Sequence, residues 1–235
     1  MAKVPPPGRC VHCLNYFNEL TWDHVFPESW YPETTAEKHE KWKIPSCNGC
    51  NKQYGKIEEE LLIKLGLCLD PNDDNSKGIV QKVLRALNPK YGKNDRDIKI
   101  RFDKKMKILK SAFWGENIPT EGRYPKFDRP LGTDVEEMAV LIKANHLRKL
   151  AEKIVRGITY IELHQFIEKP YSIDFSVLPE NGADDIQALL DRFGSVAEIQ
   201  PGIKIKKAFA SDSLSSIFYI EIWGRLSMYA FVTNE

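Results

Sequence analysis

Two pairs of cysteines constrain the fold of this chain more than any other feature. Each pair has the spacing Cys-x-x-Cys: Cys10 with Cys13, and Cys47 with Cys50, and 33 residues lie between the pairs. Two thiolates at this spacing reach one tetrahedral ion, and two such pairs form the four-sulfur site that is typical of structural zinc. Because the gap is longer than in a zinc ribbon, we expect Zn²⁺ to clamp a functional insert at both of its ends.

The cysteine count favours metal ligation over disulfide bonding. The chain has five cysteines, an odd number, and its start, MAKVPPPGRC, lacks the apolar segment of a secretion signal. We expect Cys68, in the stretch LGLCLD, to be a buried apolar filler. His12 lies inside the first pair and ranks below the four thiols as a ligand. The alternative to a zinc site is four reduced thiols that are paired by chance.

The length and hydropathy of the chain are those of a soluble protein. Its 235 residues have room for one large domain or two small ones. No segment approaches the run of apolar residues that spans a bilayer. We therefore expect a cytoplasmic protein without a membrane partner.

Hydrophobic patterning predicts an α+β fold that begins with a zinc-clamped module in residues 1–70. A short strand is expected at TWDHVF, residues 21–26, between the two cysteine pairs. After the second pair, apolar residues at helical spacing predict a helix over residues 56–69 that ends near Gly66.

The rest of the chain divides into a basic helical region, residues 71–157, and a small α+β domain of unknown role, residues 158–235. Helices are predicted in the basic region at three places: from about residue 77, over residues 97–114 and after residue 133. The Gly- and Pro-rich segment GENIPTEGRYPKFDRPLGT is the expected domain boundary. Antiparallel strands are predicted at YSIDFSVL, which alternates strictly, and at IKIKKAFA, which nearly does. Two more are predicted at SIFYIEIW and LSMYAFV, on either side of a turn, and the helix ADDIQALLDRF lies among the strands. Gly224-Arg225 predicts a two-residue hairpin turn between the last two strands.

Charge is distributed unevenly over these three parts. The first part has 8 Lys or Arg against 10 Asp or Glu, the second 20 against 12, and the third 6 against 11. The middle is therefore strongly basic, although the formal net charge of the chain is only +1. A basic surface between two acidic parts indicates a polyanionic partner, and nucleic acid is the expected one.

The insert between the cysteine pairs contains residue types that can bind a metal ion and accept a proton. An aspartate and a histidine are adjacent on the expected strand, and Asn51 directly follows the last cysteine. The pattern is DHVFP at residues 23–27, followed by CNGCN at residues 47–51. This pattern, with its two cysteine pairs, resembles the DHxxP…CxxCN pattern of the HNH endonucleases. Residues 10–60 are thus similar to a zinc-stabilised HNH module, in which a β-hairpin and a helix surround one catalytic metal ion (the ββα-metal fold).

The resemblance implies a role for each residue of the pattern. Asp23 and Asn51 would bind a catalytic Mg²⁺ or Mn²⁺, and His24 would act as the general base. Hard divalent cations take oxygen ligands, which a carboxylate and an amide supply while leaving positions for water and phosphate. A histidine titrates near neutral pH, so its neutral form accepts a proton from the water that attacks phosphorus. Adjacent strand residues face opposite ways, so Asp23 and His24 converge if the strand breaks at His24, before Pro27.

The chain departs from the family pattern at two positions. The family usually has a structural asparagine between the two halves of the pattern, where this chain has Trp42. The loop that bears His24 must then be braced by other contacts. Where the family often has a lysine after the final asparagine, this chain has Tyr54, and Lys52 or Lys56 is left to contact the scissile phosphate.

A dense run of basic residues lies between residues 82 and 110, which include eleven Lys or Arg and three Asp. Seven of them are candidates for salt-sensitive, sequence-independent phosphate contacts: Lys90, Lys93, Arg96, Lys99, Arg101, Lys104 and Lys105. The alternative is a solvated helix face. Three aromatic residues of this region are expected in the core rather than stacked on bases: Tyr91, Phe102 and Trp114.

Together these features predict a metal-dependent HNH endonuclease that hydrolyses DNA phosphodiester bonds, as in restriction, phage defence or mobile elements. One alternative is a non-catalytic zinc-binding module for nucleic acid or protein, in which Asp23, His24 and Asn51 have local structural roles. Another is a nuclease directed at RNA, since the site attacks a phosphodiester and does not itself recognise the sugar. The C-terminal part is a candidate for homodimer formation.

Overall fold

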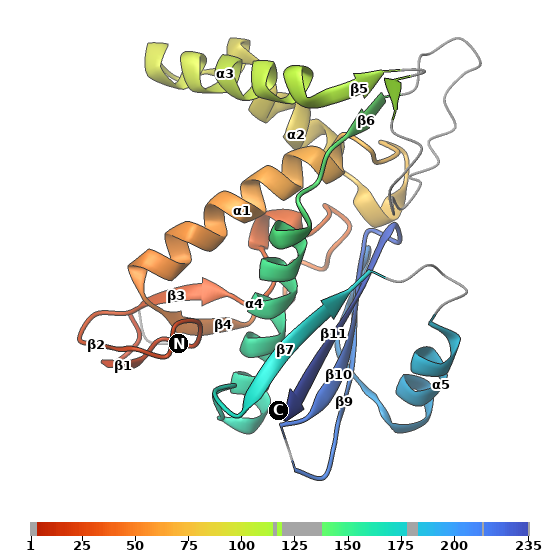
Figure 1. The fold of residues 1–235 in the computed structure, drawn as a ribbon. Helices are drawn as coiled ribbons and strands as arrows, with labels where there is room; N and C mark the ends of the chain where they lie inside the picture. The colour runs from red at the N-terminus through yellow and green to blue at the C-terminus, as the bar shows by residue number, and fades with distance from the viewer. Residues whose placement is uncertain (1–3, 115–116, 119–137, 178–182, 213, 235) are drawn as a thin grey trace.

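The computed structural model of the protein describes residues 4–114, 117–118, 138–177, 183–212 and 214–234. These residues form an α+β fold, as predicted, with a cysteine-rich module, a helical arm, and an antiparallel sheet of five strands (Figure 1). Among the described residues, no helix has both the length and the apolar character that crossing a membrane requires.

Two short hairpins and a helix build the N-terminal module. Its elements are β1 (Gly8–Arg9), β2 (Tyr16–Phe17), β3 (Thr21–His24), η1 (Glu28–Trp30), β4 (Lys43–Ser46) and α1 (Asn48–Gly66). β1 pairs with β2, and β3 pairs with β4, both antiparallel. β3 ends at His24, which confirms the predicted break in the strand before Pro27.

Helix α1 begins at Asn48, earlier than the predicted start at residue 56. Cys47 caps it, because its side chain accepts a hydrogen bond from the Cys50 N–H in place of a missing helical partner. The helix ends at Gly66, as predicted. A Cβ atom at this position would lie 2.7 Å from Val83 Cγ2, so glycine lets the next helix approach closely.

The helical arm follows α1. Its elements are η2 (Asp74–Ser76), α2 (Ile79–Leu87), η3 (Pro89–Tyr91), α3 (Asp95–Ser111), β5 (Ala112–Trp114) and β6 (Met138–Val140). A small apolar cluster joins α1, α2, α3 and β6: Ile63, Val83, Leu87, Ile108 and Val140. Most of α3 extends beyond this cluster, away from the rest of the molecule (Figure 1).

A long helix and an antiparallel sheet complete the fold. Their elements are α4 (Ala144–Leu163), β7 (Tyr171–Ser176), α5 (Asp184–Phe193), β8 (Ser195–Gln200), β9 (Ile203–Phe209), β10 (Ser216–Ile222) and β11 (Leu226–Asn234). The sheet has the order β7-β11-β10-β9-β8. Phe218 and Ile220 on β10 join the main core with α4, whereas Tyr219, between them, packs in a separate cluster with Leu190 of α5. The two helices therefore cover opposite faces of the sheet.

The main core is shared by the N-terminal module, α4 and the sheet. Ile44 of β4, Ile154 of α4 and Phe218 of β10 belong to one cluster of buried residues. Trp30 and Trp223 stack with their ring centres 5.2 Å apart, and Trp223 Nε1 donates to the Trp30 carbonyl. α4 continues across the expected boundary at residue 158.

Several predictions of secondary structure are wrong. The helix expected after residue 133 begins only at Ala144, and the apolar residues before it form β6; residues 133–137 lie outside the described part. Residues 112–114 were expected to end a helix but form β5, which pairs with β6. Runs as short as these satisfy helical and strand periods equally well, so tertiary pairing decides between them.

The sheet also differs from its prediction in two details. β8 is an additional strand that the sequence pattern did not indicate. The last hairpin turn has three residues rather than two, because Ile222 pairs with Leu226. Trp223 and Gly224 both have positive φ angles, 53° and 60°, so the left-handed region begins one residue before the glycine.

Candidate functional site

The four paired cysteines lie together at one end of the N-terminal module. Their sulfur atoms all lie within 4.8 Å of one another, although residues 13 and 47 are 34 positions apart. The connection between β1 and β2 carries Cys10 and Cys13, and the junction of β4 with α1 carries Cys47 and Cys50. Four thiolates in this arrangement can hold a metal ion such as zinc, as predicted.

Backbone N–H groups point at the sulfur atoms of this cluster. The Cys47 N–H donates to Cys10 Sγ at 3.3 Å, and the Cys50 N–H donates to Cys47 Sγ at 3.4 Å. Burial alone raises the pKa of Cys10, but hydrogen bonds from backbone N–H groups outweigh it, and the pKa is lowered to about 7. Burial raises the pKa of Cys13 and Cys50. Of these three thiols, Cys10 is therefore the one that ionises near neutral pH. Cys13 and Cys50 lose their protons when a metal ion binds to their sulfur atoms.

Asp23, predicted to bind a catalytic ion, is buried, with only 6 % of its surface exposed. Its Oδ2 atom lies 3.1 Å from His12 Nε2. Its Oδ1 atom accepts a hydrogen bond of 2.8 Å from Lys153 Nζ. The Lys153 side chain, 1 % exposed, comes from α4 and also forms an ion pair with Glu58 on α1.

These contacts belong to one buried polar group, which we call the Asp23 cluster: His12, Asp23, Tyr54, Glu58 and Lys153. The His12 and Tyr54 rings lie 4.5 Å apart between centres, and the Lys153 ammonium lies 5.7 Å from the centre of the Tyr54 ring. Tyr54 and Glu58 are four residues apart on α1 and so share one side of that helix. The cluster therefore joins the first cysteine hairpin, β3, α1 and α4.

The pKa shifts indicate which groups of the cluster are charged. Burial raises the pKa of Asp23, but the hydrogen bond with His12 and the charge of Lys153 reverse this, and the net pKa is lowered. Burial lowers the pKa of His12 and raises that of Glu58. An ionised carboxylate only accepts hydrogen bonds, so neutral His12 donates to Asp23 through Nε2.

His24 lies at the end of β3, and its side chain is 22 % exposed. Alternation along the strand places it on the face opposite to Asp23. Its Nε2 atom lies 3.7 Å from Glu28 Oε2. Burial lowers the pKa of His24 more than Glu28 raises it, which keeps the imidazole neutral at physiological pH.

Asn51 lies in the first turn of α1, against β3. Its side-chain nitrogen donates to Thr21 Oγ1 at 3.0 Å and to the Trp22 carbonyl at 3.3 Å. Thr21 and Asp23 are two positions apart in the strand, so Asn51 lies on the Asp23 side of β3. The structure thus places Asp23 and Asn51 on one side of the hairpin and His24 on the other, so the strand ends at His24 but the expected convergence of Asp23 and His24 is not seen.

The donor set of Asp23 and Asn51 suits a hard divalent cation, because it offers a carboxylate and an amide oxygen. Asp23 Oδ1, however, already holds the Lys153 ammonium. Two cations at one carboxylate oxygen repel each other strongly in a buried setting. A divalent ion can therefore bind this oxygen only when Lys153 leaves it.

The two positions that depart from the family pattern have structural roles. The Trp42 carbonyl accepts a hydrogen bond of 2.9 Å from the Val25 N–H, and this bond braces the chain just after His24. Tyr54 is buried in the Asp23 cluster. Lys52 and Lys56, the candidates for phosphate contact, are both exposed on α1.

The predicted nucleic-acid contacts in the arm fall into two groups. Arg101 and Lys104 form ion pairs, with Asp97 at 3.2 Å and with Glu59. Five further residues are exposed and form no ion pair with the described part of the chain: Lys90, Lys93, Arg96, Lys99 and Lys105.

The aromatic residues of the arm are not in the core. Tyr91, Phe102 and Trp114 are 53 %, 51 % and 41 % exposed, so the expectation that they would be buried is wrong. α3 crosses the other helices near its C-terminal end, and Ile108 is its one buried residue. No described element covers the rest of α3.

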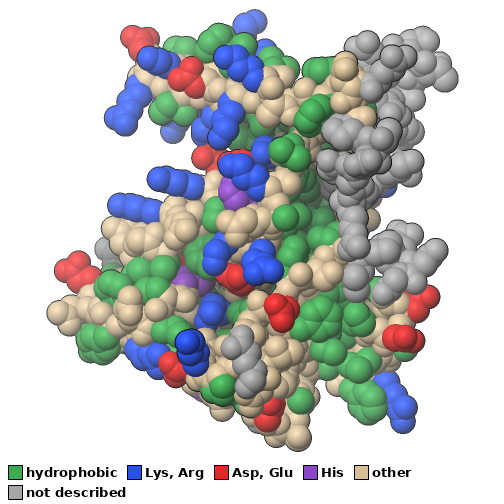
Figure 2. Space-filling model, in the orientation of Figure 1, with side chains coloured by type: hydrophobic (Ala, Val, Ile, Leu, Met, Phe, Trp, Pro, Cys, Tyr) green, Lys and Arg blue, Asp and Glu red, His purple; other side chains and the backbone are tan. Residues whose placement is uncertain are grey.

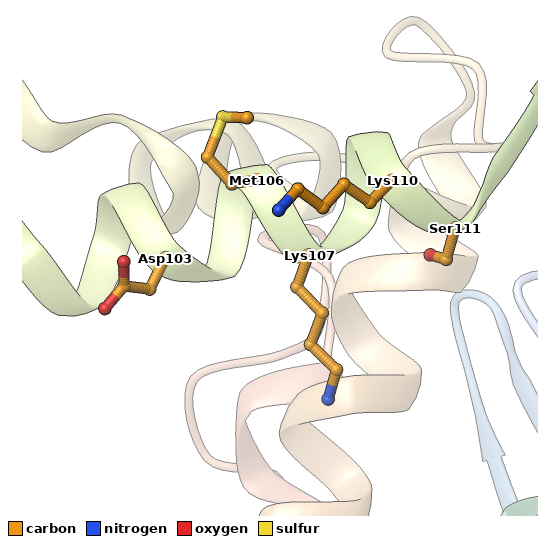
Figure 3. Close-up of a pocket in the computed structure, with 5 residues that line it drawn as sticks. All are labelled: Asp103, Met106, Lys107, Lys110 and Ser111. Atoms are coloured by element: carbon orange, nitrogen blue, oxygen red, sulfur yellow. The ribbon is translucent and has the colours of Figure 1, made fainter.

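A shallow hollow of about 360 Å³ lies along α3 (Figure 3). It is lined by Asp103, Met106, Lys107, Lys110 and Ser111. Lys107 points toward α1, where its Nζ atom lies 3.8 Å from Glu60 Oε2. The hollow is open and contains no residue of the cysteine cluster or the Asp23 cluster.

Sequence reasoning did not identify Lys153 or Glu58, and it considered His12 only as a substitute zinc ligand. A signal for Lys153 was present, because it lies between Leu150 and Gly157 on the side of the helix that is otherwise buried. A lysine on a buried helical face needs a carboxylate partner. The sequence offers no means of choosing Asp23 among the acidic residues of the chain.

No protein-family profile, curated protein or solved structure matches this chain.

Proposed function

We propose that this protein is a metal-dependent endonuclease of the HNH type that hydrolyses phosphodiester bonds in DNA. The observation that carries the proposal is the order of elements around the cysteine cluster. The β3–β4 hairpin is followed by Cys47 and Cys50 and then directly by α1, which holds Asn51 against β3. This order of elements supports the ββα arrangement that the resemblance of residues 10–60 implies.

His24 has the properties of a general base for this reaction. Its side chain reaches solvent, and its lowered pKa keeps it unprotonated at neutral pH. Glu28 Oε2, 3.7 Å away, is placed to orient the imidazole and to stabilise it once it has taken a proton. In the proposed reaction His24 accepts the proton of a water molecule that attacks phosphorus.

Asp23 and Asn51 are the residues that would hold Mg²⁺ or Mn²⁺. Such an ion, when bound, stabilises negative charge on the phosphoryl oxygens as a Lewis acid. His12 fixes the orientation of the Asp23 carboxylate through Oδ2. The cysteine cluster fixes the start of α1, and hence the position of Asn51 relative to β3.

Exposed basic side chains on α1 and α3 support a polyanionic substrate. Lys52 and Lys56 are exposed on α1, and Lys99 and Lys105 are exposed on α3. In Figure 2 the molecule is indented between α3 and the N-terminal module, and Lys and Arg side chains project on both sides of the indentation. Lysines arranged in this way neutralise phosphates without reading sequence.

Two observations favour a second candidate, a non-catalytic zinc module. His24 lies on the opposite side of β3 from Asp23 and Asn51, so the proposed base and metal ligands do not face one another. The Asp23 carboxylate is fully engaged by His12 and Lys153, as it would be if its role were to hold α4 in place. In that case the basic arm would bind nucleic acid or an acidic protein without cleavage.

Cleavage of supercoiled plasmid separates the two candidates. Zinc-loaded protein is incubated with plasmid and Mg²⁺ or Mn²⁺, and the wild type is compared with His24→Ala. His146→Ala is the matched control, since His146 is half-buried on α4 and contacts Glu60 instead of the hairpin. We expect nicking by the wild type and the control, and a loss of about 100-fold or more in His24→Ala.

Equal nicking by wild type and His24→Ala would indicate a contaminating nuclease and would reject the proposal. Binding of plasmid without nicking under both metals would favour the non-catalytic module. The same assay with an RNA competitor reports whether the site prefers DNA.

A further inference from the structure

We propose that Lys153 acts as an internal cation that holds the Asp23 carboxylate until a divalent ion displaces it, and that Glu58 then keeps the Lys153 ammonium. The inference rests on the nuclease function proposed above, and it concerns a residue that lies far outside the HNH-like segment. Lys153 would thus be a positioning residue, which acts on the reaction through Asp23.

The first argument is the place that the ammonium occupies. Lys153 Nζ lies between two carboxylates, 2.8 Å from Asp23 Oδ1 and in an ion pair with Glu58. The side chains of Lys153, Asp23 and Glu58 are 1 %, 7 % and 16 % exposed. A buried point between carboxylate oxygens is a site for a cation, and here the chain supplies that cation itself.

The second argument is the stability of the cluster without metal. A buried carboxylate that loses its counter-ion is strongly destabilised, so Asp23 could not remain ionised and buried alone. Lys153 supplies the counter-charge from α4. Because α4 packs closely against the hairpin at Gly157, the position of the Lys153 side chain relative to Asp23 is fixed.

The third argument is that the displaced ammonium already has a second partner. Lys153 contacts Glu58 and Asp23 at the same time, so release of Asp23 leaves it paired. The flexible lysine stem allows a small shift of Nζ without movement of the helix. Two carboxylates that share one ammonium also leave part of their negative charge for another cation.

Binding of Mn²⁺ to zinc-loaded protein, measured by calorimetry in the absence of nucleic acid, tests this exchange. Lys153→Met removes the internal cation, and we expect it to bind Mn²⁺ roughly tenfold more tightly than the wild type. Glu58→Gln removes the second partner of the ammonium. Lys153 is then held more firmly on Asp23, and we expect Mn²⁺ to bind roughly tenfold more weakly than to the wild type. The matched control is Lys149→Met, one turn away on α4, where the lysine pairs with Glu152. It should leave the affinity unchanged.

Opposite shifts in the two variants, together with an unchanged affinity in Lys149→Met, which removes the same charge from the same helix, support the exchange. Unchanged or weaker Mn²⁺ binding by Lys153→Met overturns it. If Lys153→Met does not fold, Glu58→Gln decides: weaker binding supports the exchange, and unchanged binding overturns it.

Asp23→Ala separates this inference from the proposed function. If Asp23→Ala binds Mn²⁺ as the wild type does, Asp23 is no ligand, and both proposals lose their metal site. If Asp23→Ala loses binding while Lys153→Met binds as the wild type does, the metal site stands and only the exchange is rejected.

Discussion

Lys153 Nζ donates a hydrogen bond of 2.8 Å to Asp23 Oδ1, across 130 positions of the sequence. This bond makes α4 part of the N-terminal module, because the helix supplies the counter-charge for a residue of the β3–β4 hairpin. The N-terminal module therefore does not contain all the groups that its own polar residues require. The properties of the site should therefore depend on both halves of the chain.

The cysteine cluster is expected to be required for folding of the module. Cys47→Ser removes a metal ligand and also changes the cap of α1, so bound zinc should be lost and the melting temperature should fall. Zinc content by mass spectrometry and thermal unfolding by circular dichroism measure both effects. Cys68→Ser, which alters a cysteine outside the cluster, should retain its zinc. A Cys47→Ser protein with full zinc content would contradict the four-sulfur site.

Zinc affinity is expected to rise with pH. Thiols must lose their protons to bind zinc; the pKa of Cys10 is about 7, whereas burial raises those of Cys13 and Cys50. Binding therefore releases more than one proton, and the apparent dissociation constant should rise more than about tenfold per pH unit on acidification below neutral pH. Competition with a chromophoric chelator at several pH values measures this slope. A flat profile would show that the thiols are already ionised in the free protein.

The contact between α4 and the hairpin is expected to be intolerant of a single added methyl group. A Cβ atom at Gly157 would lie 2.8 Å from Val25 Cγ2, so Gly157→Ala should lower the free energy of unfolding by about 1–3 kcal/mol. Gly55→Ala is the matched control on α1, because a Cβ atom there has no neighbour within 4 Å. It should raise the free energy of unfolding by about 0.5–1 kcal/mol through helix propensity. Urea denaturation distinguishes the two signs, and equal effects would show that α4 does not pack this closely.

The basic arm is expected to bind nucleic acid through phosphates. Lys99 and Lys105 are exposed on α3, so the double variant Lys99→Gln/Lys105→Gln should bind DNA more weakly. The slope of log affinity against log salt should decrease by about 2, since two phosphate contacts are lost. Fluorescence anisotropy with labelled duplex, without divalent ions, measures this slope. Lys169→Gln, an exposed lysine between α4 and the sheet, should leave the slope unchanged.

The elements that the sequence predicts well are those determined by local pattern. Strict alternation predicted β7 and near alternation predicted β9. A turn signal between two apolar runs predicted β10 and β11, and the cysteine spacing predicted the four-sulfur cluster. The end of β3 at His24 followed from Pro27, which cannot continue regular pairing. In each case the signal is a short motif, although the four-sulfur cluster needs two such motifs 34 positions apart.

The features that the sequence does not predict depend on contacts between distant residues. β5 and β6 exist as strands because they pair with each other across the residues that separate them. Lys153 is recognisable as an unusual residue on a buried face, but its partner, Asp23, is chosen by the packing of α4 on the hairpin. Likewise, Phe102 was expected in the core because it is aromatic, and it is exposed because α3 extends beyond the elements that would cover it.

The late position of α4 in the chain has a consequence for biosynthesis. Asp23 and all four cluster cysteines leave the ribosome well before Lys153 is added, and domains generally begin to fold from the N-terminus during translation. Until α4 emerges, the nascent hairpin has no internal ammonium for its buried carboxylate and no helix to cover Val25 and Ile44. The Asp23 cluster is thus completed only late in translation. A nascent chain stalled before residue 144 would lack α4 and therefore Lys153.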